Sequence, residues 1–121
     1  MAINVKKIIA VDFDGTITTN TPYPITGEIR IEAINILKKL QKAGYILCLW
    51  TCRENKDLEE AVNLLKKYNL TFDYININPK DMKKAKKINA DFYIDNKNIF
   101  FDLDWYKIEK ELLGENKNVL Y

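Results

Sequence analysis

Apolar and polar positions change along the chain in blocks whose lengths and periods predict alternating strands and helices. Four mostly apolar runs have the length of strands: residues 5–11, 45–50, 72–78 and 91–95. Three segments repeat apolar residues three and four positions apart, as amphipathic helices do: residues 33–40, 58–65 and 105–112. We expect a loop or small hairpin at 15–27, which is rich in Thr and Pro, and a short lysine-rich helix after Pro79.

This alternation predicts an α/β fold. Strands separated by helices pair in parallel through right-handed crossovers, which gives a three-layer Rossmann-like domain with a central parallel sheet of four or more strands and helices on both faces. The chain has the length of one domain, so we assign residues 1–121 to a single unit. In such sheets ligands bind beyond the carboxyl ends of the strands. The residues that directly follow each strand are therefore the candidates for a functional site.

Composition and charge narrow the classes of function. The net charge of +2 gives no general argument for binding nucleic acid or membrane, and no apolar stretch approaches a membrane span, so we expect a cytoplasmic protein. The chain has no histidine, which excludes Ser-His-Asp, Cys-His and phosphohistidine chemistry and leaves acid–base catalysis to Asp, Glu, Lys, Tyr or Cys. Its two cysteines, Cys48 and Cys52, make neither a disulfide framework nor a zinc site.

An acidic pair follows the first predicted strand, in the segment IIAVDFDGTIT. Side chains alternate along a strand, so Asp12 and Asp14 point to the same side. The two carboxylates repel each other, and Mg²⁺, which prefers oxygen ligands, would relieve that repulsion. A carboxylate beside Mg²⁺ can attack phosphorus to form an aspartyl-phosphate. The second carboxyl group can then protonate the leaving oxygen and later activate water. The residue types leave a second interpretation open, a simple turn after a strand, because Asp and Gly are common turn formers.

Two further features of residue chemistry favour an anion at this edge. Gly15 allows a tight turn that brings backbone N–H groups close to an anion, so we assign Gly15 and Thr16 to phosphate binding. Arg53 follows the second strand, where a guanidinium can grip a phosphate or carboxylate in bidentate fashion. The alternative for Arg53 is a surface ion pair with Glu54 or Asp57.

Several motifs in order along the chain carry a family resemblance. VDFDGT after an apolar strand resembles the first motif of the haloacid dehalogenase (HAD) superfamily of phosphotransferases, D-x-D-x-[TV]. LWTCRE puts Thr51 at the end of the second strand, where that family has its Ser or Thr. Lys87 lies four residues before the last strand, where capless members often carry a lysine. ADFYIDN supplies the acidic end of the fourth strand. Together with PYPITGE and FDYININP, these segments are similar to a subgroup of small bacterial and phage members.

The resemblance implies roles by position. The implied catalytic residues are Asp12 as nucleophile, Asp14 as general acid–base, Thr51 and Lys87. We expect Gly15, Thr16, Thr51 and Arg53 to bind substrate; of these, the resemblance implies Thr51 as a donor to a phosphoryl oxygen. The implied Mg²⁺ ligands are Asp12, Asp14, Asp95 and Asn96. Related members commonly have a second acid where this chain has Asn96, which would remove one negative charge from the metal site, and Lys86 competes with Lys87 for the role of functional lysine.

The intervals between the motifs are too short for an inserted cap domain, so the resemblance implies a capless member. We expect a Mg²⁺-dependent phosphomonoester hydrolase acting through an aspartyl-phosphate on Asp12. The alternative is a catalytically weak or inactive phosphate- or metal-binding module. By family analogy, the partner is a phosphorylated small molecule or an exposed phosphate on a larger molecule. The same analogy offers an alternative, in which the chain borrows a lid from a second copy in a homo-oligomer. A receiver-type phosphoacceptor domain fits less well. Such a domain has its phosphate-accepting acid on the third strand, whereas the third strand of this chain ends in Asn76 and Asn78.

Overall fold

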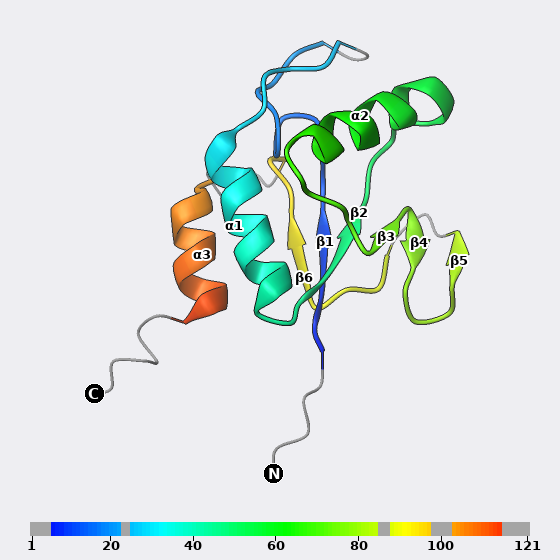
Figure 1. Cartoon of the computed structure of the whole chain (residues 1–121). Helices are drawn as coiled ribbons and strands as arrows, with labels where there is room; N and C mark the ends of the chain where they lie inside the picture. The colour runs from blue at the N-terminus through cyan, green and yellow to red at the C-terminus, as the bar shows by residue number, and fades with distance from the viewer. Residues whose placement is uncertain (1–5, 23–24, 85–87, 98–102, 115–121) are drawn as a thin grey trace.

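The sheet at the centre of the fold has the four parallel strands that the sequence predicts. The computed structural model describes residues 6–22, 25–84, 88–97 and 103–114. The sheet runs in the order β3–β2–β1–β6, with each neighbouring pair parallel. Its strands are β1 (Ile8–Val11), β2 (Ile46–Leu49), β3 (Tyr74–Ile75) and β6 (Phe92–Ile94). Figure 1 shows β1 between β2 and β6. The α/β, Rossmann-like layout is therefore confirmed.

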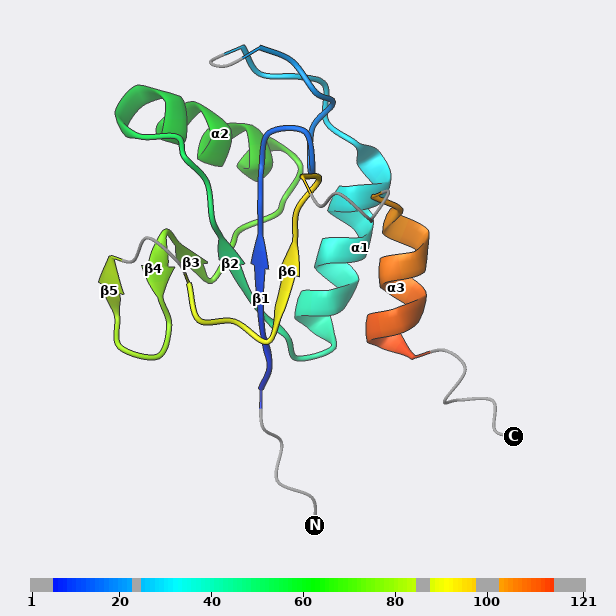
Figure 2. The same cartoon turned by 180° about the vertical axis from the view of Figure 1, so that it is seen from behind.

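Three helices form where apolar residues recur with helical spacing: α1 (Ile31–Lys42), α2 (Asn55–Lys67) and α3 (Trp105–Leu113). α3 begins after Asp104, whose carboxylate accepts hydrogen bonds from the N–H groups of Tyr106 at 3.0 Å and Lys107 at 3.3 Å. It ends at Gly114, whose φ of 62° suits a helix C-terminus. α1 and α3 lie side by side in both views (Figures 1 and 2).

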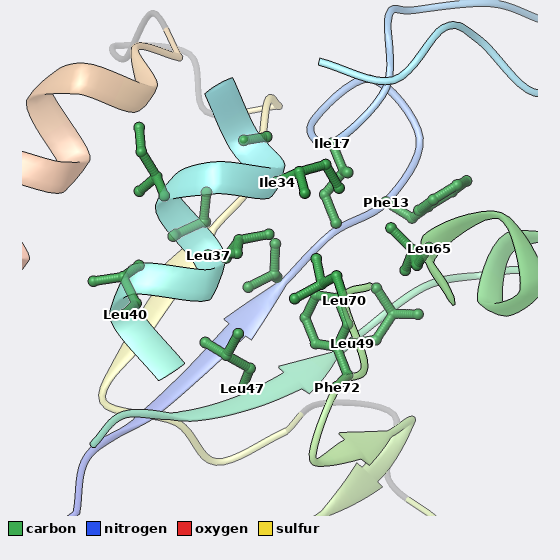
Figure 3. Close-up of a cluster of buried hydrophobic side chains, with 14 of the residues drawn as sticks. Phe13, Ile17, Ile34, Leu37, Leu40, Leu47, Leu49, Leu65, Leu70 and Phe72 are labelled. Carbon is green, nitrogen blue, oxygen red and sulfur yellow. The ribbon is translucent and has the colours of Figure 1, made fainter. Parts of the chain in front are cut away.

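The main core lies between these helices and one face of the sheet. Alternation along β1 and β2 turns Ile9, Val11, Leu47 and Leu49 to this face, where they are fully buried. Figure 3 shows these strands packed against side chains from α1, α2 and the segment after α2, with Leu37 and Leu65 among them. The described parts of all three helices contribute to this one cluster.

The opposite face of the sheet differs from the prediction of helices on both faces. There Ile8, Ala10 and Cys48 are buried against Ile88, and the described chain around them forms a hairpin of β4 (Ile77–Asn78) and β5 (Lys83–Lys84). The predicted lysine-rich helix after Pro79 is thus wrong as far as residue 84; residues 85–87 lie outside the described ranges. The physical reason is that this segment lacks the apolar stripe with which a short helix would be held on the sheet.

The winding of the chain reverses between β1 and β6. From β1 the chain passes to β2 and β3 on one side, and β6 then returns to the other side of β1. The carboxyl ends of the strands point towards the described part of the loop that leads into α1 (Figure 2). Such a reversal opens a crevice at the carboxyl ends of the two strands that flank it. No helix in the described ranges has the length and apolar character needed to cross a membrane.

Candidate functional site

The turn after β1 is held by backbone hydrogen bonds that fix the acidic pair. The N–H of Asp12 donates to the carbonyl of Ile94 at 3.0 Å, which extends the β1–β6 pairing by one residue. The carbonyl of Phe13 then accepts from the N–H groups of Thr16 at 3.1 Å and Ile17 at 2.9 Å. Gly15 has a φ of +80°, a conformation that is strained for residues with a Cβ. The sequence DGT thus turns sharply at the end of β1.

Thr16 ties this turn to the end of β6. It is fully buried, and its Oγ1 lies 3.1 Å from Asp12 Oδ2 and 3.3 Å from Asn96 Oδ1. The same oxygen accepts a hydrogen bond from the backbone N–H of Asn96 at 3.0 Å. The carbonyl of Thr16 accepts from the indole Nε1–H of Trp105 at 3.0 Å. Thr16 therefore holds the Asp12 carboxylate from behind, and Trp105 anchors Thr16 to the core.

The Asp12 carboxylate is in an electrostatically unfavourable position. Its pKa is raised from 3.8 to about 6, first by burial and then by the facing carboxylate of Asp95, while the hydrogen bond from Thr16 acts in the opposite direction. An acid with a raised pKa binds its proton more tightly in the folded chain than in the unfolded one. Without a bound cation, the contribution of Asp12 to the free energy of unfolding therefore falls as the pH rises from about 4 to about 6.

Asp14 is bound by a buried arginine. The fully buried guanidinium of Arg53 donates from Nε to Asp14 Oδ2 at 2.9 Å and from Nη2 to Asp14 Oδ1 at 2.7 Å, a bidentate pair. Arg53 also donates to the carbonyl of Asp57 at 3.2 Å and to Thr26 Oγ1 at 3.1 Å, and it lies over the ring of Phe13. The hydrogen bond to Asp14, followed by the negative charges of Asp14, Glu60 and Asp57, raises the pKa of Arg53, while burial acts in the opposite direction.

Thr51 is held at the end of β2 with its hydroxyl facing the site. Its backbone N–H donates to Asn76 Oδ1 at 2.9 Å, and its Oγ1 accepts from the N–H of Arg53 at 3.1 Å. A hydroxyl that accepts one hydrogen bond keeps its own proton free to donate. Asn76 reaches Thr51 from the end of β3, where it adopts a positive φ of 52° that Asn tolerates better than most residues.

A cleft of about 990 Å³ opens beside these strand ends. Of the predicted site residues, Asp12, Thr51, Arg53 and Asp95 line it. The structure thus brings together the strand ends that the sequence singled out. Asp14, Gly15, Thr16 and Asn96 are described but do not line this cleft. Lys86 and Lys87 lie outside the described residues, so the predicted lysine stays a prediction.

The structure adds detail that sequence reasoning missed. Arg53 is neither on the surface nor paired with Glu54: it is buried against Asp14, although its substrate-binding role stays a prediction. Trp50, the last residue of the predicted strand 45–50, lines the cleft and also contacts the ring of Tyr93. Its place at the end of β2, next to the polar Thr51, was a signal in the sequence that could have indicated a position in the cleft.

The oxygen donors at the site suit a divalent cation of the Mg²⁺ type. Among the described residues no three Asp, Glu or Cys side chains gather as a metal cluster. Mg²⁺, however, usually takes one or two carboxylates and fills its shell with water and substrate phosphate. Asp12 and Asp95 supply two carboxylates whose repulsion a cation would relieve. Asn96 turns its amide towards Thr16 and Gly15, so a direct ligand role for Asn96 would need another side-chain orientation.

Comparisons with known proteins agree with this arrangement. The family model described as haloacid dehalogenase-like hydrolase matches residues 9–113. A solved structure of a conserved protein from Bacteroides thetaiotaomicron has a TM-score of 0.81 and 34% sequence identity, with 92% of this chain and 93% of that chain covered. No curated protein matches the chain.

Proposed function

Because the chain belongs to the haloacid dehalogenase-like hydrolase family, we propose that it is a Mg²⁺-dependent phosphomonoester hydrolase that acts through an aspartyl-phosphate on Asp12. The single observation that carries this proposal is the position of Asp12. It follows β1 at the reversal of the sheet, faces Asp95 across that reversal, and lines the cleft together with Thr51. A nucleophilic carboxylate, a second carboxylate and a hydroxyl donor are the parts that phosphoryl transfer requires.

In the first step an oxygen of Asp12 attacks phosphorus, the bond from phosphorus to the ester oxygen breaks, and the leaving oxygen takes up a proton. With a pKa of about 6, Asp12 is mostly ionised at neutral pH, as a nucleophile must be. In the second step water attacks phosphorus and loses a proton, the bond to Asp12 breaks, and inorganic phosphate leaves. When bound, Mg²⁺ would be held by Asp12 and Asp95 and would neutralise charge on the phosphoryl oxygens.

Thr51 and Asp14 have separate roles in this proposal. The Thr51 hydroxyl, which already accepts a hydrogen bond from Arg53, donates its proton to a phosphoryl oxygen. Asp14 exchanges the proton with the leaving oxygen and then with water. In the described arrangement Asp14 accepts two hydrogen bonds from Arg53. Asp14 does not line the cleft in this arrangement, so its side chain has to turn towards the leaving oxygen to act as the general acid.

The test is the release of phosphate from a panel of phosphomonoesters, with and without Mg²⁺. We expect turnover by the wild type with Mg²⁺, and a loss of several orders of magnitude in Asp12→Asn. The matched control is Asp104→Asn, which removes a carboxylate at the start of α3 and leaves a good helix cap. Turnover in Asp12→Asn equal to that of the wild type would refute the covalent mechanism, and no turnover on any ester despite Mg²⁺ binding would favour the inactive module.

A further inference from the structure

The cleft is larger than the phosphoryl chemistry needs. Its volume of about 990 Å³ lies at the upper end of the range of roughly 300–1,000 Å³ for sites that hold drug-sized ligands. Asp12, Asp95 and Thr51 occupy one part of it. The rest extends past β2 and β3 to the β4–β5 hairpin, over a set of side chains that the proposed chemistry does not use. We call this set the hairpin wall: Trp50, Ile75, Ile77, Met82 and Lys84.

The hairpin wall is apolar except for Lys84, and it is incompletely covered by the protein. Trp50, Ile75 and Ile77 are partly exposed, and Met82 is 59% exposed. Met82 also has a φ of 60°, which is uncommon for a residue with a long side chain. Exposed apolar side chains that gather along a cleft, rather than singly over the surface, mark a binding surface. The indole ring of Trp50 offers a ligand a flat contact surface, and the flexible side chain of Met82 can adapt to the shape of the ligand.

Charge divides the cleft between its two ends. Asp12 and Asp95 end β1 and β6, whereas Lys84 stands on the hairpin beyond β3. In the hairpin Lys84 pairs across the strands with Ile77, so both side chains point to the face that lines the cleft. Neighbouring strands lie about 4.8 Å apart, so β1 and β3 are separated by about 10 Å. The cleft is also lined by Arg53, which is bound to Asp14, and by Glu54, which directly precedes α2. A ligand that runs from Asp12 towards the hairpin passes the apolar side chains and reaches the ammonium group of Lys84.

We propose that the hairpin wall binds the leaving group of the substrate, and that this group is flat, apolar and negatively charged at its far end. The phosphate ester would lie at Asp12, an aromatic body would contact Trp50, Ile77 and Met82, and a carboxylate or second phosphate would meet Lys84. This inference rests on the proposed function and names its substrate class: small organic phosphates with an anionic aryl-bearing leaving group. In this proposal the hairpin contacts the leaving group of the substrate, a role that an inserted cap domain would otherwise have.

Substrates with chemically similar leaving groups separate binding from reactivity. Ethyl phosphate, 2-phenylethyl phosphate and 2-(4-carboxyphenyl)ethyl phosphate all release a primary alcohol, so differences in kcat/KM report contacts with the rest of the group. We expect 2-phenylethyl phosphate to exceed ethyl phosphate by about tenfold or more, since apolar contacts of this kind discriminate by that order. The carboxylate should add about threefold, the size of a solvent-exposed ion pair.

The hairpin offers a matched pair of variants. Lys84→Gln should abolish the threefold gain from the carboxylate, whereas Lys83→Gln should preserve it, because Lys83 is the neighbouring residue on the opposite face of the same strand. Met82→Asn should lower the preference for the phenyl group about threefold, while Asn tolerates the positive φ at this position. Circular dichroism of each variant confirms that the fold is kept.

Binding measurements distinguish failure of the inference from failure of the proposed function. The phosphonate analogues of the three esters cannot be hydrolysed, and calorimetry with Mg²⁺ gives their affinities directly. Turnover without preference among the three esters, or equal effects of Lys83→Gln and Lys84→Gln, would overturn the hairpin wall as a subsite and leave the hydrolase. Absence of turnover with a preserved order of phosphonate affinities would overturn the hydrolase and support the subsite. Equal phosphonate affinities would overturn the subsite whatever the turnover.

Discussion

Replacing Arg53 by Met tests the most buried charge of the candidate site. Met has a similar length and no charge, so the substitution removes the two hydrogen bonds to Asp14 at 2.9 Å and 2.7 Å and leaves that carboxylate without its guanidinium. Removing one partner of a buried ion pair costs about 3–5 kcal/mol. The side chain of Asp14 is 30% exposed, so water can hydrate it in part and the lower end applies. We expect the free energy of unfolding to fall by about 3 kcal/mol.

Urea unfolding followed by circular dichroism measures this change, which should also lower the Tm by about 10 °C for a chain of this length. The control is Lys39→Met. Lys39 pairs with Glu109 at 2.8 Å, but its side chain is 60% exposed, so we expect a loss within about 0.5 kcal/mol. Two ion pairs of similar length thus predict very different costs because only one is buried.

A double-mutant cycle with Asp14→Asn isolates the pair itself. If the bidentate contact stabilises the fold as described, the double variant should be more stable than the sum of the single losses predicts, by about 2 kcal/mol. Arg53→Lys should recover less than half of the loss, because one ammonium group cannot reproduce the planar fork. Additive losses in the cycle, or an Arg53→Met variant within about 1 kcal/mol of the wild type, would refute this reasoning.

Three further predictions test other parts of the site. In EDTA at pH 7.5, Asp12→Asn should raise the free energy of unfolding by up to about 3 kcal/mol, because it removes a carboxylate whose pKa is raised to about 6. This gain should vanish at pH 4, where Asp12 is protonated in the folded protein; no gain at pH 7.5 would contradict the raised pKa. Gly15→Ala should lower the free energy of unfolding in urea by about 2 kcal/mol, since Gly15 has a φ of +80° and a new Cβ would clash with the side-chain amide nitrogen of Asn96. Gly44→Ala, with φ +109° and open space, shows the backbone cost alone, and equal losses would count against the steric cause. A thiol reagent at pH 8 should label the exposed Cys52 in the native protein and Cys48 only after unfolding, since burial raises the pKa of Cys48 to about 11; two labels in the native state would contradict the packing of β2.

The sequence alone predicted the parallel sheet well because the runs around Ile9 and Leu47 are apolar on both faces. Such runs admit few structures other than a covered strand. The β4–β5 hairpin was missed because its strands have two residues each, and their pairing depends on contacts with the sheet and not on a local period. Asn78, Pro79 and Asp81 form a turn-rich sequence, which was the available signal.

The ion pair between Asp14 and Arg53 shows why part of the candidate site could not be predicted. The two residues are 39 positions apart, and nothing in the local sequence of either one names its partner. The register of the sheet identifies the partners. Val11 on β1 lies opposite Leu49 on β2, Asp14 follows Val11 by three positions, and Arg53 follows Leu49 by four. A strand register would therefore have placed the pair, but register is fixed by packing over the whole sheet.

This pairing also bears on where the positive charge for a phosphate comes from. Arg53 is the buried cation at the site, and Asp14 already balances its charge. A phosphate dianion that approaches Asp12 therefore meets two carboxylates, its own target and Asp95, with that guanidinium engaged elsewhere. Two like charges at about 4 Å repel by about 1 kcal/mol even in bulk water and by more in a partly buried cleft. In the proposed function, phosphate binding beside Asp12 would therefore need a further counter-charge, since Lys84, the other cation among the described residues that line the cleft, stands on the hairpin. A divalent cation held by Asp12 and Asp95 would meet that need, because it would relieve the repulsion between the two carboxylates and attract the phosphoryl oxygens.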